Sequence, residues 1–440
     1  MLSWAYIMPL LLPAVTPRIL FAIALILAFL ACWIFLPAPN RPLLALGVGA
    51  PEVSAWLVVG ALIVLGLTFV FDGPPEGGHY VRLVVVGAAI LASVPLVRVP
   101  SVVRRFDAAM RASLGDDLLA GVPTDQRARM RRAPVVALDL FRGINAGNAR
   151  VTRGIAFATP QGVPLTLDVY RPAGEPDKAR PTGPIRYPAV VQIYGGAWQR
   201  GVPGDNATFA TYLASHGFVV FAIDYRHAPR WQWPAQIEDV RTALAWIREH
   251  GGDYDADPSR LALVGRSAGA QLAMTAAYEP DAPPVAAVVS LYGPVDLVDG
   301  YRNPPRPDPI DVRTIEELFL GGSPDAQPAR YREASPITYV DSRTARVRAA
   351  SSPGAGAASS LPPSLLIYGS RDHVVLSRFG AMLDDRLRAA GATSVFLEIP
   401  WAEHAFDIIP NGPSGQLSLY YTEQFLAWAL LTPGRRTSAP

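Results

Sequence analysis

A serine with a glycine two residues away on each side, where an apolar run passes into an alanine-rich run, most constrains this chain. Residues 261–264 predict a short buried strand, and residues 268–277 predict a helix directly behind it. The motif Gly-x-Ser-x-Gly occupies residues 265–269 between them. A serine hydroxyl is a weak nucleophile that must be held exposed beside a base, and a tight turn from strand to helix achieves this. We therefore predict Ser267 as a nucleophile, with N–H groups at the helix start available to a developing oxyanion.

The base expected beside this serine is a histidine near the C-terminal end of the chain. His404 follows the strand predicted at residues 394–399, in a loop from which an imidazole can reach the serine. His373 is adjacent to the candidate acid, and adjacent residues seldom point at one another in a relay. We therefore predict His404 as the base. The remaining histidines are predicted to be structural or solvated: His79, His216, His227 and His250.

The acid that orients this base is expected after the preceding strand. Residues 364–368 predict an apolar strand, and Asp372 lies four residues beyond its end. A carboxylate there can fix the tautomer of His404 and stabilise its cation. The alternative interpretation of Asp372 is a solvated turn residue. Asp384 and Asp385 are weaker candidates because they fall within a predicted helix.

Backbone donors for the oxyanion are expected in a loop of small residues. Residues 188–194 predict a buried strand, and Gly195, Gly196 and Ala197 follow it directly. Little side chain obstructs such a loop, so its N–H groups can turn inward.

Predicted strands alternate with predicted helices from residue 149 onward. Residues 154–158 and 165–170 predict a hairpin, and the alternation after it predicts a mostly parallel sheet covered on both faces. The stretch 292–363 interrupts this pattern and is predicted to be a lid or specificity region, with a flexible loop at 349–360.

These residues resemble the hormone-sensitive-lipase-like carboxylesterases of the α/β-hydrolase superfamily. The nucleophile, acid and base also follow the chain order of that superfamily, Ser267, Asp372, His404. The resemblance implies that the N–H groups of Gly196, Ala197 and Ala268 form the oxyanion hole. Two departures affect that loop, because Tyr194 stands where the family has histidine and Ala197 where it has a third glycine. The matching motifs are Tyr194-Gly195-Gly196-Ala197, Asp224-Tyr225-Arg226, Ala228-Pro229, Glu238-Asp239, Asp257-Pro258 and Gly265-Arg266-Ser267-Ala268-Gly269.

Apolar runs near the N-terminus predict a membrane region. Residues 19–36 and 53–71 contain no charge, and residues 81–97 form a third candidate with Arg82 near one end. Runs of this length can cross about 30 Å of hydrocarbon as helices. Buried core helices are the alternative. We predict an α/β-hydrolase fold preceded by a bundle of about three transmembrane helices.

Positive charge predicts how this region is oriented. The loop 72–80 holds acidic residues and no Lys or Arg, whereas Arg98, Arg104, Arg105 and Arg111 follow the third run. The short loop predicted at 37–52 carries Arg41. Because positive charge marks the cytoplasmic side, we predict an external N-terminus and a cytoplasmic catalytic domain.

The predicted organisation has three parts: a transmembrane region at 1–100, a helical connector or cap at 101–148, and a catalytic domain at 149–435. Val102, Val103, Phe106 and Met110 fall at helical spacing among arginines in the connector. It is predicted to lie on anionic headgroups, to be a solvated connector, or to cover the catalytic domain, with equal support for each.

We predict a membrane-anchored serine hydrolase that cleaves carboxylic esters, with no cofactor and no metal. The alternatives are an amidase or peptidase with the same triad, and a non-catalytic ligand-binding protein on a hydrolase fold. The net charge of +2 gives no indication of a nucleic-acid partner, and the single cysteine, Cys32, excludes a disulfide within the chain. The expected partners are a small or amphipathic ester and membrane lipid. The sequence gives no prediction of oligomeric state.

Overall fold

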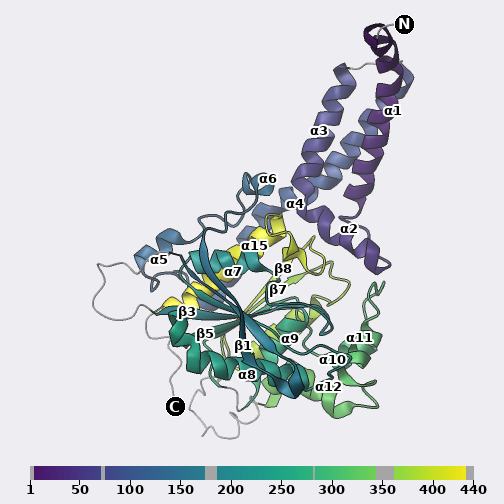
Figure 1. The fold of residues 1–440 in the computed structure, drawn as a ribbon. Helices are drawn as coiled ribbons and strands as arrows, with labels where there is room; N and C mark the ends of the chain where they lie inside the picture. The colour runs from purple at the N-terminus through teal and green to yellow at the C-terminus, as the bar shows by residue number, and fades with distance from the viewer. Residues whose placement is uncertain (1–3, 71–74, 174–185, 281–282, 343–360, 433–440) are drawn as a thin grey trace.

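The computed structural model describes residues 4–70, 75–173, 186–280, 283–342 and 361–432. An eight-stranded sheet lies at the centre of the larger part, and a group of N-terminal helices projects from one side of it (Figure 1). The loop predicted at 349–360 lies outside the described residues.

The sheet has the strand order β1-β2-β4-β3-β5-β6-β7-β8. β1 and β2 form the predicted antiparallel hairpin, and β2 is antiparallel to β4, while all later neighbours are parallel. The mostly parallel sheet predicted from the alternation is confirmed. Because its parallel strands are covered on both faces, they are apolar along nearly their whole length. The strands are β1 (Ala149–Ala158), β2 (Leu165–Pro172), β3 (Tyr187–Ile193), β4 (Val219–Ile223), β5 (Ala256–Arg266), β6 (Ala287–Leu291), β7 (Ser364–Gly369) and β8 (Ser394–Ile399).

Helices connect the strands and pack on the sheet (Figure 1). The stretch 292–363, predicted as an insertion, contributes three of the short helices, α10, α11 and α12. The helices of this part are η1 (Pro160–Gly162), α7 (Ala207–Ser215), α8 (Ala235–His250), η2 (Gly251–Tyr254), α9 (Ala268–Tyr278), α10 (Leu297–Arg302), α11 (Val312–Leu320), α12 (Pro328–Ala334), α14 (Arg378–Ala389), η3 (Phe406–Ile408) and α15 (Pro413–Leu431).

Three N-terminal helices, α1 (Trp4–Cys32), α3 (Ser54–Val70) and α4 (Pro75–Leu114), pack against one another (Figure 1). Most of the large apolar side chains that the described residues expose belong to this bundle, among them Ile26, Ile63 and Leu83. By length and composition, one described helix, 78–114, can cross a membrane, and α2 with α3 would count as a second only if the bent pair formed one span. The structure therefore does not confirm three spans.

The stretch 37–52, predicted as a loop, contains a further helix, α2 (Arg41–Glu52), so that prediction is wrong. Asn40 caps it by accepting a hydrogen bond from the Leu43 N–H at 3.1 Å, and Pro42 suits the first turn because its missing N–H is not needed there. α2 and α3 are bent by 76° relative to one another. This bend places α2 at the base of the bundle, beside the α/β domain (Figure 1).

The helix α4 continues without a break from the bundle to the hydrolase domain. Val102, Phe106 and Met110 are buried in the same apolar core as the sheet, together with Leu114. The first part of residues 101–148 therefore packs on the hydrolase domain, with its apolar face on β8 and α15. The boundary at residue 100 falls inside a continuous helix.

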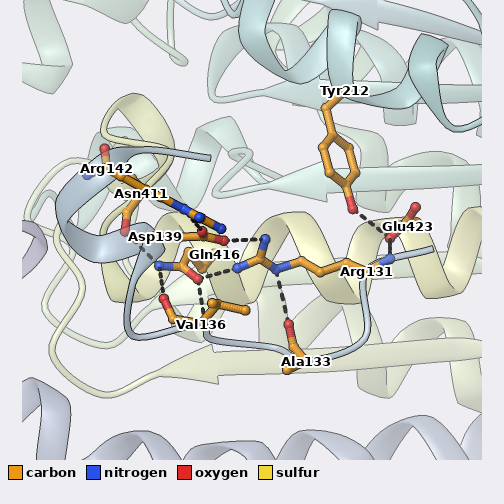
Figure 2. Close-up of polar contacts among 9 residues, drawn as sticks. All are labelled: Arg131, Ala133, Val136, Asp139, Arg142, Tyr212, Asn411, Gln416 and Glu423. Carbon is orange, nitrogen blue, oxygen red and sulfur yellow. Dashed lines mark hydrogen bonds and ion pairs between the residues drawn. The ribbon is translucent and has the colours of Figure 1, made fainter. Parts of the chain in front are cut away.

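A polar cluster fastens the chain after α4 to α15. Two short helices, α5 (Thr124–Arg129) and α6 (Asp139–Arg142), flank this segment. Figure 2 shows Arg131 lying along α15 between Gln416 and Glu423. The Arg131 guanidinium pairs with Asp139 at 2.9 Å and donates to Gln416, while the Arg131 backbone N–H donates to Glu423 at 3.0 Å. Arg131 and Asp139 expose only 9% and 6% of their side chains, so the pair is largely shielded from water.

The same end of α15 also receives a carboxylate from the bundle. Glu52, the last residue of α2, accepts hydrogen bonds from the N–H groups of Ser414 at 2.9 Å and Gly415 at 3.4 Å. These hydrogen bonds satisfy two of the N–H groups that the first turn of α15 leaves without a partner inside the helix. Trp56 of α3 packs edge-on against Phe141 of α6 at 5.0 Å between ring centroids. The base of the bundle is thus joined to the hydrolase domain by the buried hydrogen bonds of Glu52 and by an exposed aromatic contact.

Replacing Arg131 should destabilise the whole protein. In Arg131→Leu the buried carboxylate of Asp139 keeps only the exposed Arg142, at 3.0 Å, as an ion-pair partner. Removing one half of a buried ion pair costs up to about 3–5 kcal/mol. The exposed neighbour supplies a matched control, Arg132→Leu. Chemical denaturation of the detergent-solubilised chain should show a large loss for the first variant and little change for the second. Equal stability of the two variants would contradict this role of Arg131.

Candidate active site

Ser267 stands on a sharp turn between β5 and α9 (Ala268–Tyr278). Its backbone has φ 52° and ψ −121°, a strained combination for a residue with a side chain. A Cβ on Gly265 would lie 2.3 Å from the Gly269 carbonyl oxygen, and one on Gly269 would lie 2.3 Å from that of Ile193. Larger residues at either glycine would therefore push the turn apart. The Ser267 N–H donates to the Leu291 carbonyl at 3.0 Å and holds the turn on β6.

The three residues predicted as nucleophile, base and acid lie in one hydrogen-bonded chain. His404 Nε2 is 2.9 Å from Ser267 Oγ, and His404 Nδ1 is 2.8 Å from Asp372 Oδ2. The other carboxylate oxygen of Asp372 accepts the N–H groups of Val374 at 2.8 Å and Val375 at 2.7 Å. Burial raises the pKa of Asp372, while His404 and the Val375 N–H act to lower it. Asp372 is thus a buried, fully hydrogen-bonded residue, not the solvated turn residue of the alternative interpretation.

The second histidine of this region, His373, points to a different carboxylate. His373 Nδ1 lies 2.6 Å from Glu403 Oε2, and the other Glu403 oxygen accepts the N–H groups of His373 at 2.6 Å and His404 at 3.0 Å. Glu403 therefore ties together the two loops that carry the acid and the base. The hydrogen bond to Glu403 is the main cause that raises the pKa of His373. Sequence reasoning missed Glu403, although it directly precedes His404.

The loop after β3 lies against the serine turn, as expected for the predicted oxyanion donors. A Cβ on Gly195 would be 2.7 Å from the Arg266 carbonyl oxygen and 3.1 Å from Ser267 Cβ, so a side chain at this position would push the loop away from the serine turn. Gly196 and Ala197 have φ of 134° and 56°, and both line the same cavity as Ser267. Ala268 is the first residue of α9 and is buried. Their role as donors stays a prediction.

Tyr194, which replaces the family histidine, is buried in its own network behind this loop. Its hydroxyl donates to Asp224 and lies 2.9 Å from His227 Nε2, while its ring stacks on Tyr225 at 4.5 Å. Tyr194 is not among the residues that line the cavity. Tyr194 therefore holds the loop on the side away from the cavity, and the small residues of the loop line the cavity.

A buried ion pair that sequence reasoning missed lies beside the serine. Arg266 Nε donates to Asp407 Oδ2 at 2.5 Å, and the Tyr292 hydroxyl donates to the other oxygen of Asp407. The Tyr292 ring packs edge-on against the His404 ring at 4.7 Å. These contacts fix the imidazole from one side. Arg266 occupies the variable position of the serine motif, and a charged residue at such a buried turn was the available signal.

A cavity of about 710 Å³ opens over Ser267 and His404. This volume is typical of sites for small organic ligands. The wall is largely apolar and comes from distant parts of the chain: Leu44 and Val48 of α2, Ile310 and Ile315 of the stretch 292–363, and Ile408 of η3. Within the described residues, no side chain of 101–148 lines this cavity.

Comparison with known proteins places the chain among esterases. The BD-FAE family model matches residues 167–348. Esterase LipQ of Mycobacterium tuberculosis is 30% identical over an alignment that covers 69% of this chain and 70% of LipQ. The chain therefore belongs to the same esterase family as LipQ. Esterase LipC of the same organism is 34% identical, over 57% of this chain and 59% of LipC.

The solved structures agree on the fold of this esterase. Esterase LipW from Mycobacterium marinum, at 22% identity, covers 76% of this chain and 90% of its own with a TM-score of 0.50. Together with the curated relatives, this identifies an esterase-like hydrolase of the α/β-hydrolase fold. The chain spans between 54% and 70% of the length of the first three curated relatives.

The pair of His373 and Glu403 should make the stability of this esterase pH-dependent. Because folding raises the pKa of His373 above its ordinary 6.5, the pair stabilises the fold fully below pH 6.5. That stabilisation is lost as pH rises through the raised pKa. The difference in Tm between the wild type and His373→Gln should therefore be largest at and just below pH 6.5 and shrink as the pH rises through the raised pKa of His373. A difference that grows with pH would contradict the pairing.

Proposed function

We propose that this esterase hydrolyses carboxylic esters with Ser267 as nucleophile, His404 as base and Asp372 as the acid that orients the base. Ser267 Oγ attacks the ester carbonyl carbon as its proton passes to His404 Nε2. The alcohol then leaves with that proton and an acyl-enzyme remains. His404 next takes a proton from water, which attacks the acyl carbon. His404 then returns this proton to Ser267 Oγ as the bond to the acyl carbon breaks and the carboxylic acid is released.

The observation that carries this proposal is the unbroken chain of hydrogen bonds from Asp372 through His404 to Ser267, ending in an apolar cavity. At 2.9 Å, His404 Nε2 is within reach of the serine proton in the resting protein. Asp372 accepts from His404 Nδ1, so it favours the tautomer whose Nε2 is free to accept. The largely apolar wall favours a substrate with an alkyl chain.

The oxyanion of the tetrahedral intermediate is assigned to the N–H groups of Gly196, Ala197 and Ala268. Ala268 begins a helix, so its N–H is free of the helix's own hydrogen bonds. Positive φ at Gly196 and Ala197 sets this loop apart from an extended strand and supports an inward turn of its amides. The alanine at 197 retains its N–H, so the donor set needs no third glycine.

We further infer that the N-terminal bundle anchors this esterase in a membrane, with the catalytic domain in the cytoplasm. The bundle exposes large apolar side chains around its outer surface, as a helix in lipid does. Only 28% of the most apolar window of the helix 78–114 is buried, unlike a core helix of a soluble protein. Arg98, Arg104 and Arg105 lie at the domain end of α4, which favours a cytoplasmic domain.

Removing either end of the hydrogen-bonded pair should abolish turnover. Ser267→Ala and His404→Ala should each lower kcat on p-nitrophenyl esters by about 10,000-fold or more, because the members of such a triad act as a unit. Ser267→Ala should also lose labelling by a fluorophosphonate probe. The matched controls are Ser377→Ala and His373→Ala, which should lose far less.

Two outcomes would contradict this assignment. Labelling that persists in Ser267→Ala would move the nucleophile elsewhere. A larger loss of kcat in His373→Ala than in His404→Ala would show that His404 is not the base. Thermal unfolding of each variant verifies that the fold is retained.

The proposed membrane orientation predicts which reporter will be active when it is fused to the C-terminus. Green fluorescent protein at this position should fluoresce, and alkaline phosphatase should be inactive, because the domain end of α4 carries the arginines. The same two reporters fused to the N-terminus should give the reverse pattern. An active C-terminal phosphatase would overturn the orientation.

A further inference from the structure

One face of α2 points into the active-site cavity. Its lining residues recur at helical spacing, three, four, seven and eight positions after the first: Arg41, Leu44, Ala45, Val48 and Gly49. This helix lies between α1 and α3 in the chain and packs against the base of the apolar bundle. The wall of the site is therefore built in part by a segment outside the α/β-hydrolase domain.

Contacts at both ends hold α2 against the catalytic loops. Just before α2, the Phe35 carbonyl accepts a hydrogen bond from Arg371, the neighbour of Asp372. In the middle, a Cβ on Gly47 would lie 3.8 Å from Glu403 Cγ, which is ordinary contact distance. At the end, Glu52 accepts the N–H groups at the start of α15. The helix is thus seated on the same loops that carry the acid and the base.

Residue size along this face controls the free space above Ser267. Gly49 has open space where a side chain would begin, since a Cβ there would meet no atom within 4 Å. Ala45 is small as well, while Leu44 and Val48 supply apolar surface. Ile310 and Ile315 line the same cavity from the stretch 292–363. An alkyl chain between these two sets of side chains would lose water on both sides.

We propose that α2 is the specificity wall of the site, and that the side chains at positions 44, 48 and 49 set the length of alkyl chain that an ester substrate can carry. The inference rests on the proposed ester hydrolysis at Ser267. The substrate class is an ester with an aliphatic chain, one part of which lies against α2 at the base of the N-terminal bundle. The bundle then has a role in substrate choice in addition to anchoring.

The test measures kcat/KM for full-length protein on p-nitrophenyl esters from acetate to decanoate. Gly49→Leu fills the open space and should lower the ratio of octanoate to acetate by about 10- to 100-fold, since single methylenes change apolar pockets by such factors. Leu44→Ala widens the cavity and should move the preferred chain to a longer ester. Gly66→Leu is the matched control, because Gly66 lies on exposed α3 surface with the same open space but outside the cavity.

The outcomes separate this inference from the proposed function. Wild-type ratios in both Gly49→Leu and Leu44→Ala, with both variants folded and labelled by the fluorophosphonate probe, would overturn the role of α2 and leave ester hydrolysis intact. An equal shift in Gly66→Leu would also overturn it, because the effect would then come from the bundle at large. A wild-type protein that hydrolyses no ester of the series would overturn the proposed function and this inference together.

Discussion

Close packing of backbone around Ser267 is the constraint on which the site depends. The serine keeps its strained φ because Gly265 and Gly269 leave no side chain between β5, α9 and β3. Gly195 acts in the same way, because the absence of a Cβ there lets the loop after β3 approach the serine. The turn, the loop and the helix start thus form one packed unit. The packing of the buried strands around the turn offsets this strain, because it holds both ends of the turn in place.

Buried carboxylates extend this unit outward to the rest of the chain. Asp407 holds Arg266 and Tyr292 beside the imidazole, Glu403 joins the loops of the acid and the base, and Glu52 joins α2 to α15. Each is costly to bury alone and is held by several donors, so removing a partner disturbs more than one loop. The N-terminal helices are therefore structurally coupled to the site. A chain that began at residue 149 would lose α2 from the cavity wall and Phe106 from the core.

The sequence predicted the elements that local pattern determines. The strand and helix around Ser267, the hairpin of β1 and β2, and the mostly parallel sheet follow from apolar runs and turn residues. It also predicted the three residues of the hydrogen-bonded chain, because acid and base each follow a strand. It did not predict α2, since a short helix with Gly47, Gly49 and Pro51 resembles a loop in composition and is stabilised by long-range contacts. Glu403 and Asp407 were missed for a similar reason: their partners are distant in sequence.

A structure of the covalent adduct at Ser267 would show both the nucleophile and the place of the alkyl chain. The full-length protein in lipid nanodiscs would be reacted with an octyl fluorophosphonate and solved by cryo-electron microscopy. We expect phosphorus bonded to Ser267 Oγ and a phosphonyl oxygen facing the N–H groups of Gly196, Ala197 and Ala268. The octyl chain should lie in contact with Leu44 and Val48 of α2. An adduct on another residue, or an octyl chain directed away from α2, would contradict these expectations.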